Sequence, residues 1–227
     1  MLLYAKLIAV YFSSRMQAGR LLSSKLVRKY RHENCAILAL DDGGVIVGTQ
    51  LANKIHCIMM LLMTDEIRLP LEPDAIAGIT SSGDFAYNSR YSLGEIEELA
   101  VEYRGLIEQE KLTSIHELNR ILSRGSVVNK KLLKDKSIIV VSEGFKSSFS
   151  LDLALAFLKS VNFKKLVIAT PLASVQAVDR MHIAGDEIYC LSVIDDYIDT
   201  DHYYDKKDIP DHDVILRTLK EVLIKWV

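Results

Sequence analysis

The chain of 227 residues lacks the features that define several common classes of protein. It has only three cysteines, odd in number and far apart, at positions 35, 57 and 190. This usage argues against a disulfide framework or a zinc site and favours buried, reduced thiols in a cytoplasmic protein. The net charge of −2 offers no electrostatic case for binding nucleic acid or anionic membranes.

Sequence motifs for several cofactors and reactions are also missing. There is no G-x-G-x-x-G and no Walker loop, which disfavours dinucleotides and nucleoside triphosphates as ligands. No G-x-S-x-G is present, so neither Ser142 nor Ser148 is a candidate nucleophile of the hydrolase type. The apolar start, Met1 to Phe12, is too short to span a bilayer and is interrupted by Lys6. We interpret this start as part of the fold rather than as a signal peptide.

Short apolar runs alternate with helical patterns along the chain. This alternation predicts one α/β domain over residues 1–227, with a central parallel sheet of about five strands and helices on both faces. Residues 64–88 contain two of the four prolines and several turn signals. We expect a short hairpin around residues 75–80 and loop in the rest of this segment. The expected strands cover residues 35–40, 57–63, 137–141, 165–170 and 187–193, and the expected helices cover 15–29, 45–55, 92–122 with a break near 113, 150–160, 174–183 and 214–227.

The loop between the apolar run at 137–141 and the following helix is the most informative segment. It reads VSEGFKSSFS from Val141 to Ser150. A strand, a loop with glycine and serines, and then a helix aim free backbone N–H groups and the positive end of a helix dipole at one point, which suits a phosphate. The alternative is a helix start that is rich in capping residues and binds no ligand.

Five segments in register make the chain resemble a family of predicted bacterial phosphoribosyltransferases, which have the type I phosphoribosyltransferase fold. The matching segments are Phe12 to Leu22 (FSSRMQAGRLL), Leu40 to Gly48 (LDDGGVIVG), Pro73 to Ile79 (PDAIAGI), the loop Val141 to Ser150, and the tail phrase that runs from Thr170-Pro171 through Asp186 to Leu191. The resemblance implies a small hood over the sheet. We expect the hood to be built from the N-terminal segment and residues 64–88.

The resemblance also assigns roles to two loops. It implies that the loop after residue 141 binds the phosphate and ribose, through Ser142, Glu143, Gly144, Phe145, Lys146, Ser147, Ser148 and Ser150. It implies that the turn Asp41, Asp42, Gly43 and Gly44 is the pyrophosphate loop. Magnesium is the cofactor that the resemblance suggests, with Glu143 as its candidate ligand. The implied partner is a nucleoside monophosphate or a ribose phosphate, and we expect a homodimer.

The departures from the family's pattern lie at positions that the resemblance assigns to ligand binding. Ser142 stands where the family has the first of two acids, and Asp42 stands where it has an arginine. Asp65 and Glu66 align with positions that the family usually fills with basic residues. A carboxylate in place of a cation about 4 Å from a diphosphate changes the interaction by several kcal/mol at an effective dielectric constant of about 20. We therefore expect a degenerate site that binds phosphoribosyl pyrophosphate poorly.

Two acidic segments have a functional and a structural interpretation. The carboxylates of Asp41 and Asp42 could bind a metal or an amine, or could lie in a solvated turn. The segment from Asp195 to Asp213 contains eight aspartates among nineteen residues, together with His202 and His212. Its histidines do not have the spacing of a helix-borne zinc site, so we expect a solvated acidic loop.

Three hypotheses about function follow. The first is a phosphoribosyltransferase-like protein that keeps the phosphate loop and transfers weakly or not at all from phosphoribosyl pyrophosphate. The second is an active phosphoribosyltransferase that uses an unidentified base or amine. The third is a non-catalytic, structural homo-oligomer. The acids at positions 42, 65 and 66, together with Ser142, separate the second hypothesis from the other two.

Overall fold

The computed structural model describes residues 11–122 and 128–226. Five strands form a parallel sheet in the order β2-β1-β6-β7-β8, which confirms the predicted α/β class. Every residue of β1 and β6 is buried, as expected for central strands covered on both faces. The strand bounds are β1 Cys35–Ala39, β2 Ile58–Leu61, β6 Ser137–Val141, β7 Lys165–Ser174 and β8 Glu187–Ile194.

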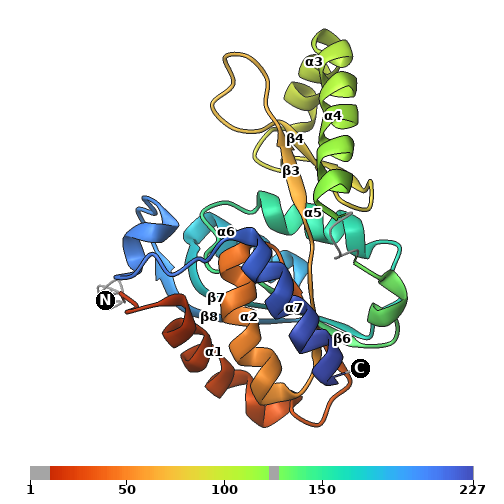
Figure 1. Ribbon diagram of the computed structural model, residues 1–227. Coiled ribbons are helices and arrows are strands. Elements are labelled where there is room, and N and C mark those ends of the chain that lie inside the picture. Colours follow the sequence, from red (N-terminus) through yellow and green to blue (C-terminus); the bar gives the residue numbers. More distant parts are fainter. Residues whose placement is uncertain (1–10, 123–127, 227) are drawn as a thin grey trace.

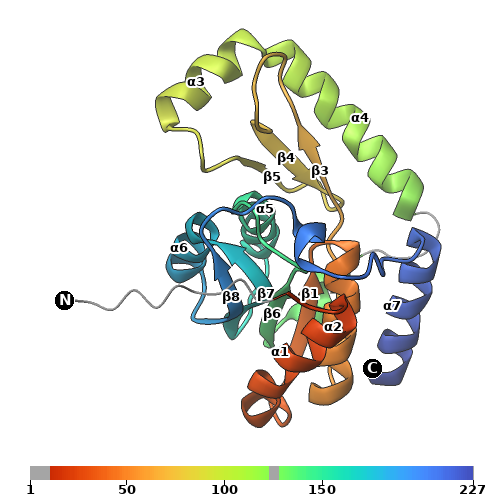
Figure 2. The same ribbon diagram turned by 90° about the vertical axis from the view of Figure 1, so that its left-hand side faces the viewer.

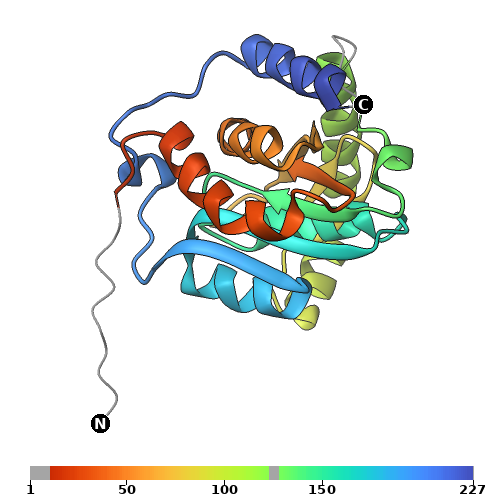
Figure 3. The ribbon, with the colours of Figure 1, turned by 90° about the horizontal axis from the view of Figure 1, so that it is seen from below.

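Helices cover both faces of this sheet (Figures 1 and 3). Helices α1 (Arg15–Tyr30), α2 (Asp42–Ile55) and α7 (His212–Trp226) pack on one face, where their apolar residues join Ile37 and Ile139 in one core. Helices α5 (Phe149–Leu158) and α6 (Val175–Ala184) pack on the other face, with the alternate strand residues Leu38 and Val140. Short 3-10 helices lie at Lys130–Leu133 and Thr200–Tyr203. Within the described residues, no helix is long and apolar enough to cross a membrane.

The hood is larger than predicted and occupies residues 64–122. Its three strands, β3 Thr64–Ile67, β4 Ala77–Thr80 and β5 Phe85–Tyr87, form an antiparallel sheet, of which only the segment at β4 was expected. Helices α3 (Leu93–Glu102) and α4 (Arg104–Leu122) complete the hood, which stands above the parallel sheet (Figure 2). Its small core includes Ile67, Leu69, Ile76 and Ile107.

The N-terminal segment is not part of the hood where the structure describes it. Phe12 forms a parallel bridge with Tyr204, near the end of β8, and the two rings lie 5.8 Å apart. Residues 1–10, which we also expected to contribute to the fold and the hood, lie outside the described residues.

Two element boundaries differ from the prediction for identifiable reasons. The break in the hood helices lies at Tyr103, which has φ −103° and ψ 20°, and not near Thr113. Ser114 is buried within α4, so its spacing to Glu117 does not mark a helix start. Strand β7 continues through Pro171 to Ser174, because β6 has already ended beside Ala169 and does not need the missing N–H.

The order of the strands places a topological switch point between β1 and β6. The chain passes from β1 outward to β2, and then returns to β6 on the other side of β1. In open parallel sheets, ligands bind outside the carboxyl ends of the strands at such a switch point. The residues that follow β1 and β6, Asp41 and Ser142, are therefore brought together, and the Leu40 N–H donates to the Val141 carbonyl at 3.0 Å.

A pair of glycine substitutions tests the packing of α1 against α2. A Cβ atom at Gly19 would lie 2.8 Å from the Val47 carbonyl oxygen, so Gly19→Ala should destabilise the fold by about 1–3 kcal/mol. A Cβ atom at Gly105, in α4, would meet nothing within 4 Å, so Gly105→Ala should stabilise its helix by roughly 0.5–1 kcal/mol. Urea denaturation followed by circular dichroism measures both changes, and equal effects of the two substitutions would contradict this packing.

Candidate functional site

A buried arginine lies next to the loop that follows β6. Arg15, at the start of α1, is 1% exposed, and its guanidinium forms ion pairs with Glu143, Asp201 and Asp208. The pair with Asp208 is 3.2 Å long, and the guanidinium also lies 4.5 Å from the centre of the Tyr204 ring. The cluster joins α1, the loop after β6 and the acidic segment (residues 195–213).

Asp41 holds the loop after β6 against α2. Its side chain caps α2 by accepting the Gly44 N–H, and it accepts the Ser142 hydroxyl at 2.5 Å and the Glu143 N–H at 3.3 Å. The Asp41 carboxylate is therefore surrounded by donors from its own chain. Its contacts are those of a partly buried helix cap, which is neither the metal or amine site nor the solvated turn that the sequence suggested.

Asp42 points away from this cluster. Its carboxylate lies 3.0 Å from Nδ1 of His212, the first residue of α7, and both side chains are about one-third exposed. The pair links the start of α2 to the start of α7. The two adjacent acids after β1 thus contact different parts of the molecule, so they do not converge on one ligand.

Burial and like charge raise the pKa values of the two inner carboxyl groups. Burial and the neighbouring Asp41 raise the pKa of Glu143 to about 7, although Arg15 opposes the shift. Burial also raises the pKa of Asp41, against the hydrogen bonds that it accepts. Burial would lower the pKa of Arg15, but its three carboxylate partners outweigh that effect and raise it.

The first turn of α2, which the resemblance assigns to pyrophosphate, is filled by protein. A Cβ atom at Gly43 would overlap the Glu143 carboxylate, so that carboxylate lies directly against the backbone of the turn. The next N–H, that of Gly44, donates to Asp41. The positive end of α2 thus already faces two carboxylates of its own chain.

The loop Gly144 to Ser150 divides into an anchored half and an accessible half. Phe145 is buried, and its N–H and carbonyl pair with Leu172 and Ser174 of β7 at 2.9 Å each. Ser142 is buried as well. A Cβ atom at Gly144 would overlap the Tyr197 hydroxyl. These three predicted site residues therefore shape the loop and do not present side chains to a ligand.

The second half of the loop is open at the N-terminus of α5. Within the described residues, no protein acceptor is bonded to the backbone N–H groups of Lys146, Ser147, Ser148 and Ser150. Ser148 occupies the capping position but makes no side-chain capping bond. Its hydroxyl lies 3.2 Å from that of Ser89 in the hood. Unpaired donors at a helix start are the geometry that binds phosphate.

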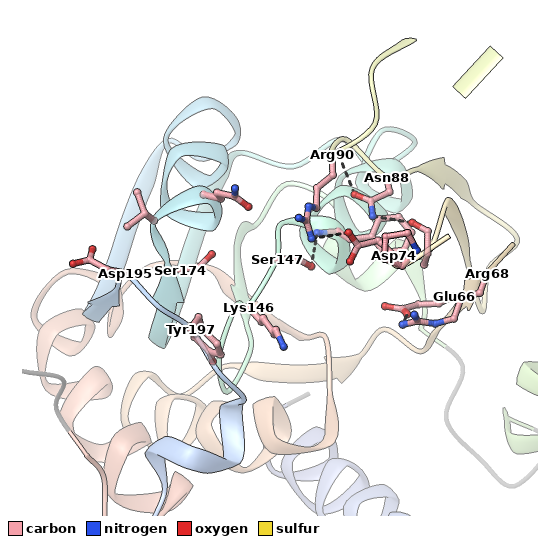
Figure 4. A pocket seen from close by; sticks show the side chains of 15 residues that line it. Glu66, Arg68, Asp74, Asn88, Arg90, Lys146, Ser147, Ser174, Asp195 and Tyr197 are labelled. Carbon is pink, nitrogen blue, oxygen red and sulfur yellow. Dashed lines mark hydrogen bonds and ion pairs between the residues drawn. The ribbon is translucent and has the colours of Figure 1, made fainter. Parts of the chain in front are cut away.

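Two of these N–H groups belong to Lys146 and Ser147, which line a cleft between the hood and the sheet. The cleft has a volume of about 630 Å³ and is lined by Lys146, Ser147, hood residues and the ends of β7 and β8. In Figure 4, Lys146 and Ser147 lie between Tyr197 and Ser174 on one side and the hood residues Asn88 and Arg90 on the other. The Lys146 ammonium donates to the carbonyl of Ile198 at 2.8 Å. The volume is that of an ordinary small-molecule site.

Positive and negative side chains balance in this cleft. Its lining has three cations, Arg68, Arg90 and Lys146, and three carboxylates, Glu66, Asp74 and Asp195. Arg68 pairs with Glu66 at 2.5 Å, and Arg90 pairs with Asp74 at 2.8 Å. The predicted acid at position 66 thus lies in the cleft and neutralises a hood arginine. The cleft offers hydrogen-bond donors but little net positive charge.

The carboxylates here do not form a ready magnesium site. Among the described residues, no group of three or more histidine, cysteine or acidic side chains is arranged to hold a metal ion. The Glu143 carboxylate is paired with Arg15, so a metal would have to displace that guanidinium. Magnesium binding through Glu143 stays a prediction, and the arrangement of these residues does not favour it.

The acidic segment has a role that its composition did not indicate. We expected a solvated loop, but Asp201 and Asp208 pair with Arg15, and the Tyr204 hydroxyl donates to the Glu143 carbonyl at 2.7 Å. The Phe12 to Leu22 phrase contains Arg15, yet we gave it no site role. A basic residue at the start of an apolar helix, together with an unexplained excess of aspartates, is the signal that could have linked them.

The pH dependence of stability tests the buried Glu143. A carboxyl group whose pKa is raised on folding stabilises the protein at low pH, and this contribution is lost as the pH rises from the ordinary value of 4.5 towards about 7. The free energy of unfolding should therefore fall between pH 5 and pH 8, and Glu143→Gln should flatten that fall. Urea titrations at each pH measure the slope. Parallel slopes for the two proteins would contradict the raised pKa.

Comparison with known proteins supports the resemblance. No family model matches the chain. Two curated proteins of Mycobacterium tuberculosis, named putative phosphoribosyl transferase Rv0571c and MT0597, are each 22% identical over 182 residues. The match covers 80% of this chain but only 40% of those proteins, so the chain spans less than half the length of these relatives.

Solved structures extend the comparison to the fold. The crystal structure of TT1426 from Thermus thermophilus matches with a TM-score of 0.71 and 22% identity, over 96% of this chain and 100% of that one. A purine phosphoribosyltransferase from Pyrococcus horikoshii matches with a TM-score of 0.48 and 12% identity, over 88% of this chain and 95% of that one. The chain thus shares its fold, a five-stranded parallel sheet with an antiparallel hood, with TT1426, and its sequence is similar to two proteins named putative phosphoribosyl transferases.

Proposed function

We propose that this protein binds a phosphorylated ribose compound, either a nucleoside monophosphate or ribose 5-phosphate, and that it transfers very weakly or not at all from phosphoribosyl pyrophosphate. One observation carries the proposal. The carboxylates of Asp41 and Glu143 fill the first turn of α2, while four of the N–H groups around the start of α5 have no acceptor in the described chain.

The electrostatic argument disfavours a diphosphate at α2. Above about pH 7, where Glu143 is ionised, a phosphate charge about 4 Å from its carboxylate is repelled by about 4 kcal/mol at an effective dielectric constant of 20. Displacing Glu143 would relieve the repulsion, but it would also break the ion pair with buried Arg15. Arg15 would keep Asp201 and Asp208, so this break costs less than the roughly 3–5 kcal/mol of a buried charge left without any partner. Both routes weaken the binding of the diphosphate.

The start of α5 supports the binding of a monophosphate. Its N–H groups and the Ser147 hydroxyl can donate to phosphate oxygens without displacing a carboxylate. Lys146 can turn from the Ile198 carbonyl towards the anion, because its side chain is exposed. The cleft above leaves room for a ribose and a base beneath the hood. A homodimer and a magnesium requirement stay predictions.

Charge reversal at Lys146 tests the phosphate site. Titration calorimetry with ribose 5-phosphate and AMP should show binding by the unchanged protein, and Lys146→Glu should weaken it at least tenfold, about 1.4 kcal/mol. Lys159→Glu, an exposed lysine at the other end of α5, is the matched control and should bind normally. Unchanged affinity in Lys146→Glu would remove the loop from the site.

Removal of the Glu143 carboxylate tests the blocked turn. Glu143→Ala would expose the Gly43 backbone and leave the Arg15 cation facing it, so affinity for pyrophosphate should rise about tenfold or more. Glu143→Asp keeps the charge and should show no such gain. Calorimetry with pyrophosphate compares the three proteins. Micromolar binding of phosphoribosyl pyrophosphate by the unchanged protein, with release of pyrophosphate, would show instead that it is a working transferase.

A further inference from the structure

Basic side chains gather on α1 and α2, although the whole chain carries a net charge of −2. Residues 15–32 contain six lysines and arginines and no acid. Two of the six are paired, Arg15 with its three carboxylates and Lys29 with Glu187 of β8. The others leave this face of the molecule with an excess of positive charge.

A groove between the two helices collects part of this charge. It has a volume of about 650 Å³ and is lined by nine residues, among them Arg20, Arg31 and Lys54, and none of the nine carries a carboxylate. Gln50, Asn53, His56 and two serines supply the remaining polar side chains, and Lys225 of α7 donates to Asn53 at 3.2 Å. The groove shares no lining residue with the cleft under the hood.

The groove cations differ from those of the cleft in lacking counter-ions. Across residues 11–122 and 128–226, no carboxylate lies within ion-pair distance of Arg20, Arg31 or Lys54. In the cleft, by contrast, each hood arginine has its own acid. Like charges that share a concave surface repel one another, and a bound anion would relieve that repulsion.

The shape and chemistry of the groove indicate the ligand. Arg20 and Arg31 are eleven residues apart on one helix, which separates them by about 16 Å. Their guanidinium groups suit phosphate oxygens, as do the side-chain amides and hydroxyls. The one aromatic ring in the lining, that of His56, is stacked on Trp226 at 4.5 Å and is not open to a base. An extended anion without a stacked base fits these features.

We propose that the groove between α1 and α2 binds a chain of linked phosphates, either inorganic polyphosphate or the polyphosphate part of a nucleotide. The site is independent of the monophosphate site under the hood. It takes its affinity from Arg20, Arg31 and Lys54 and reads no base. A single phosphate is too short to bridge the two arginines, so affinity increases with the number of linked phosphates.

The single tryptophan gives a direct readout of this site, because Trp226 stacks on the groove residue His56. Tripolyphosphate and a longer polyphosphate, titrated at constant ionic strength, should change its fluorescence with saturation, and the longer chain should bind more tightly. The side chains of Arg31 and Lys54 are exposed, so Arg31→Glu and Lys54→Glu should leave the fold intact, and each should weaken polyphosphate binding at least tenfold. Lys159→Glu, on the opposite face of the sheet, should not change polyphosphate binding. Calorimetry should give the same affinities for these proteins as the fluorescence titrations.

Two further comparisons distinguish inorganic polyphosphate from a nucleotide as the ligand, and the groove from the cleft as the binding site. Equal binding of ATP and tripolyphosphate would support recognition of the chain alone. The proposal would be overturned if the protein bound ATP but not tripolyphosphate, or single-stranded DNA but not polyphosphate. Unchanged affinity for polyphosphate in both groove variants would overturn it as well. Lys146→Glu should leave polyphosphate binding intact, and Arg31→Glu should leave AMP binding intact, so failure of one site is distinguishable from failure of the other.

Discussion

The burial of Arg15 among three carboxylates is the constraint on which the site depends. A buried guanidinium is tolerated only when its charge is matched and its donors are used, and here α1, the loop after β6 and the acidic segment each contribute to that match. Once the acidic segment is held there, Tyr204 reaches the Glu143 carbonyl and the Ile198 carbonyl reaches Lys146. The shape of the loop after β6 therefore follows from an ion cluster beneath it.

The same cluster explains why two similar helix starts differ in what they can bind. The starts of α2 and α5 lie beside each other at the carboxyl edge of the sheet, and both expose N–H groups in their first turn. At α2 those groups face Asp41 and the Glu143 carboxylate that Arg15 holds in place. At α5 the first-turn acid, Asp152, is instead held by Ser89 and Arg180. The first-turn N–H groups of α2 thus face carboxylates of the protein itself, whereas those around the start of α5 remain available to a ligand.

The parallel sheet could be predicted from sequence because its strands are short apolar runs, such as Ile138 to Val141, and helical patterns alternate with most of them. The hood could not be predicted in full, because strand β3 reads Thr-Asp-Glu-Ile and has only one buried residue. Its pairing depends on β4 and on the hood helices, which are distant in sequence. The loops of the candidate site were located by resemblance and spacing. The partners of Arg15 were not, because an ion pair between residues 15 and 201 leaves no local pattern.

The distribution of charge, rather than its total, decides what each surface can recognise. In the cleft, each hood arginine is held by a neighbouring acid, so affinity there must come from directional N–H donors at the start of α5. Such donors can surround one phosphate group but cannot neutralise a second, which favours a monophosphate over a diphosphate. In the groove, Arg20, Arg31 and Lys54 lack acids within ion-pair distance in the described chain, so affinity there must come from charge and must weaken as salt screens it. A net charge of −2 conceals both situations, because it averages the acidic segment with the basic helix α1.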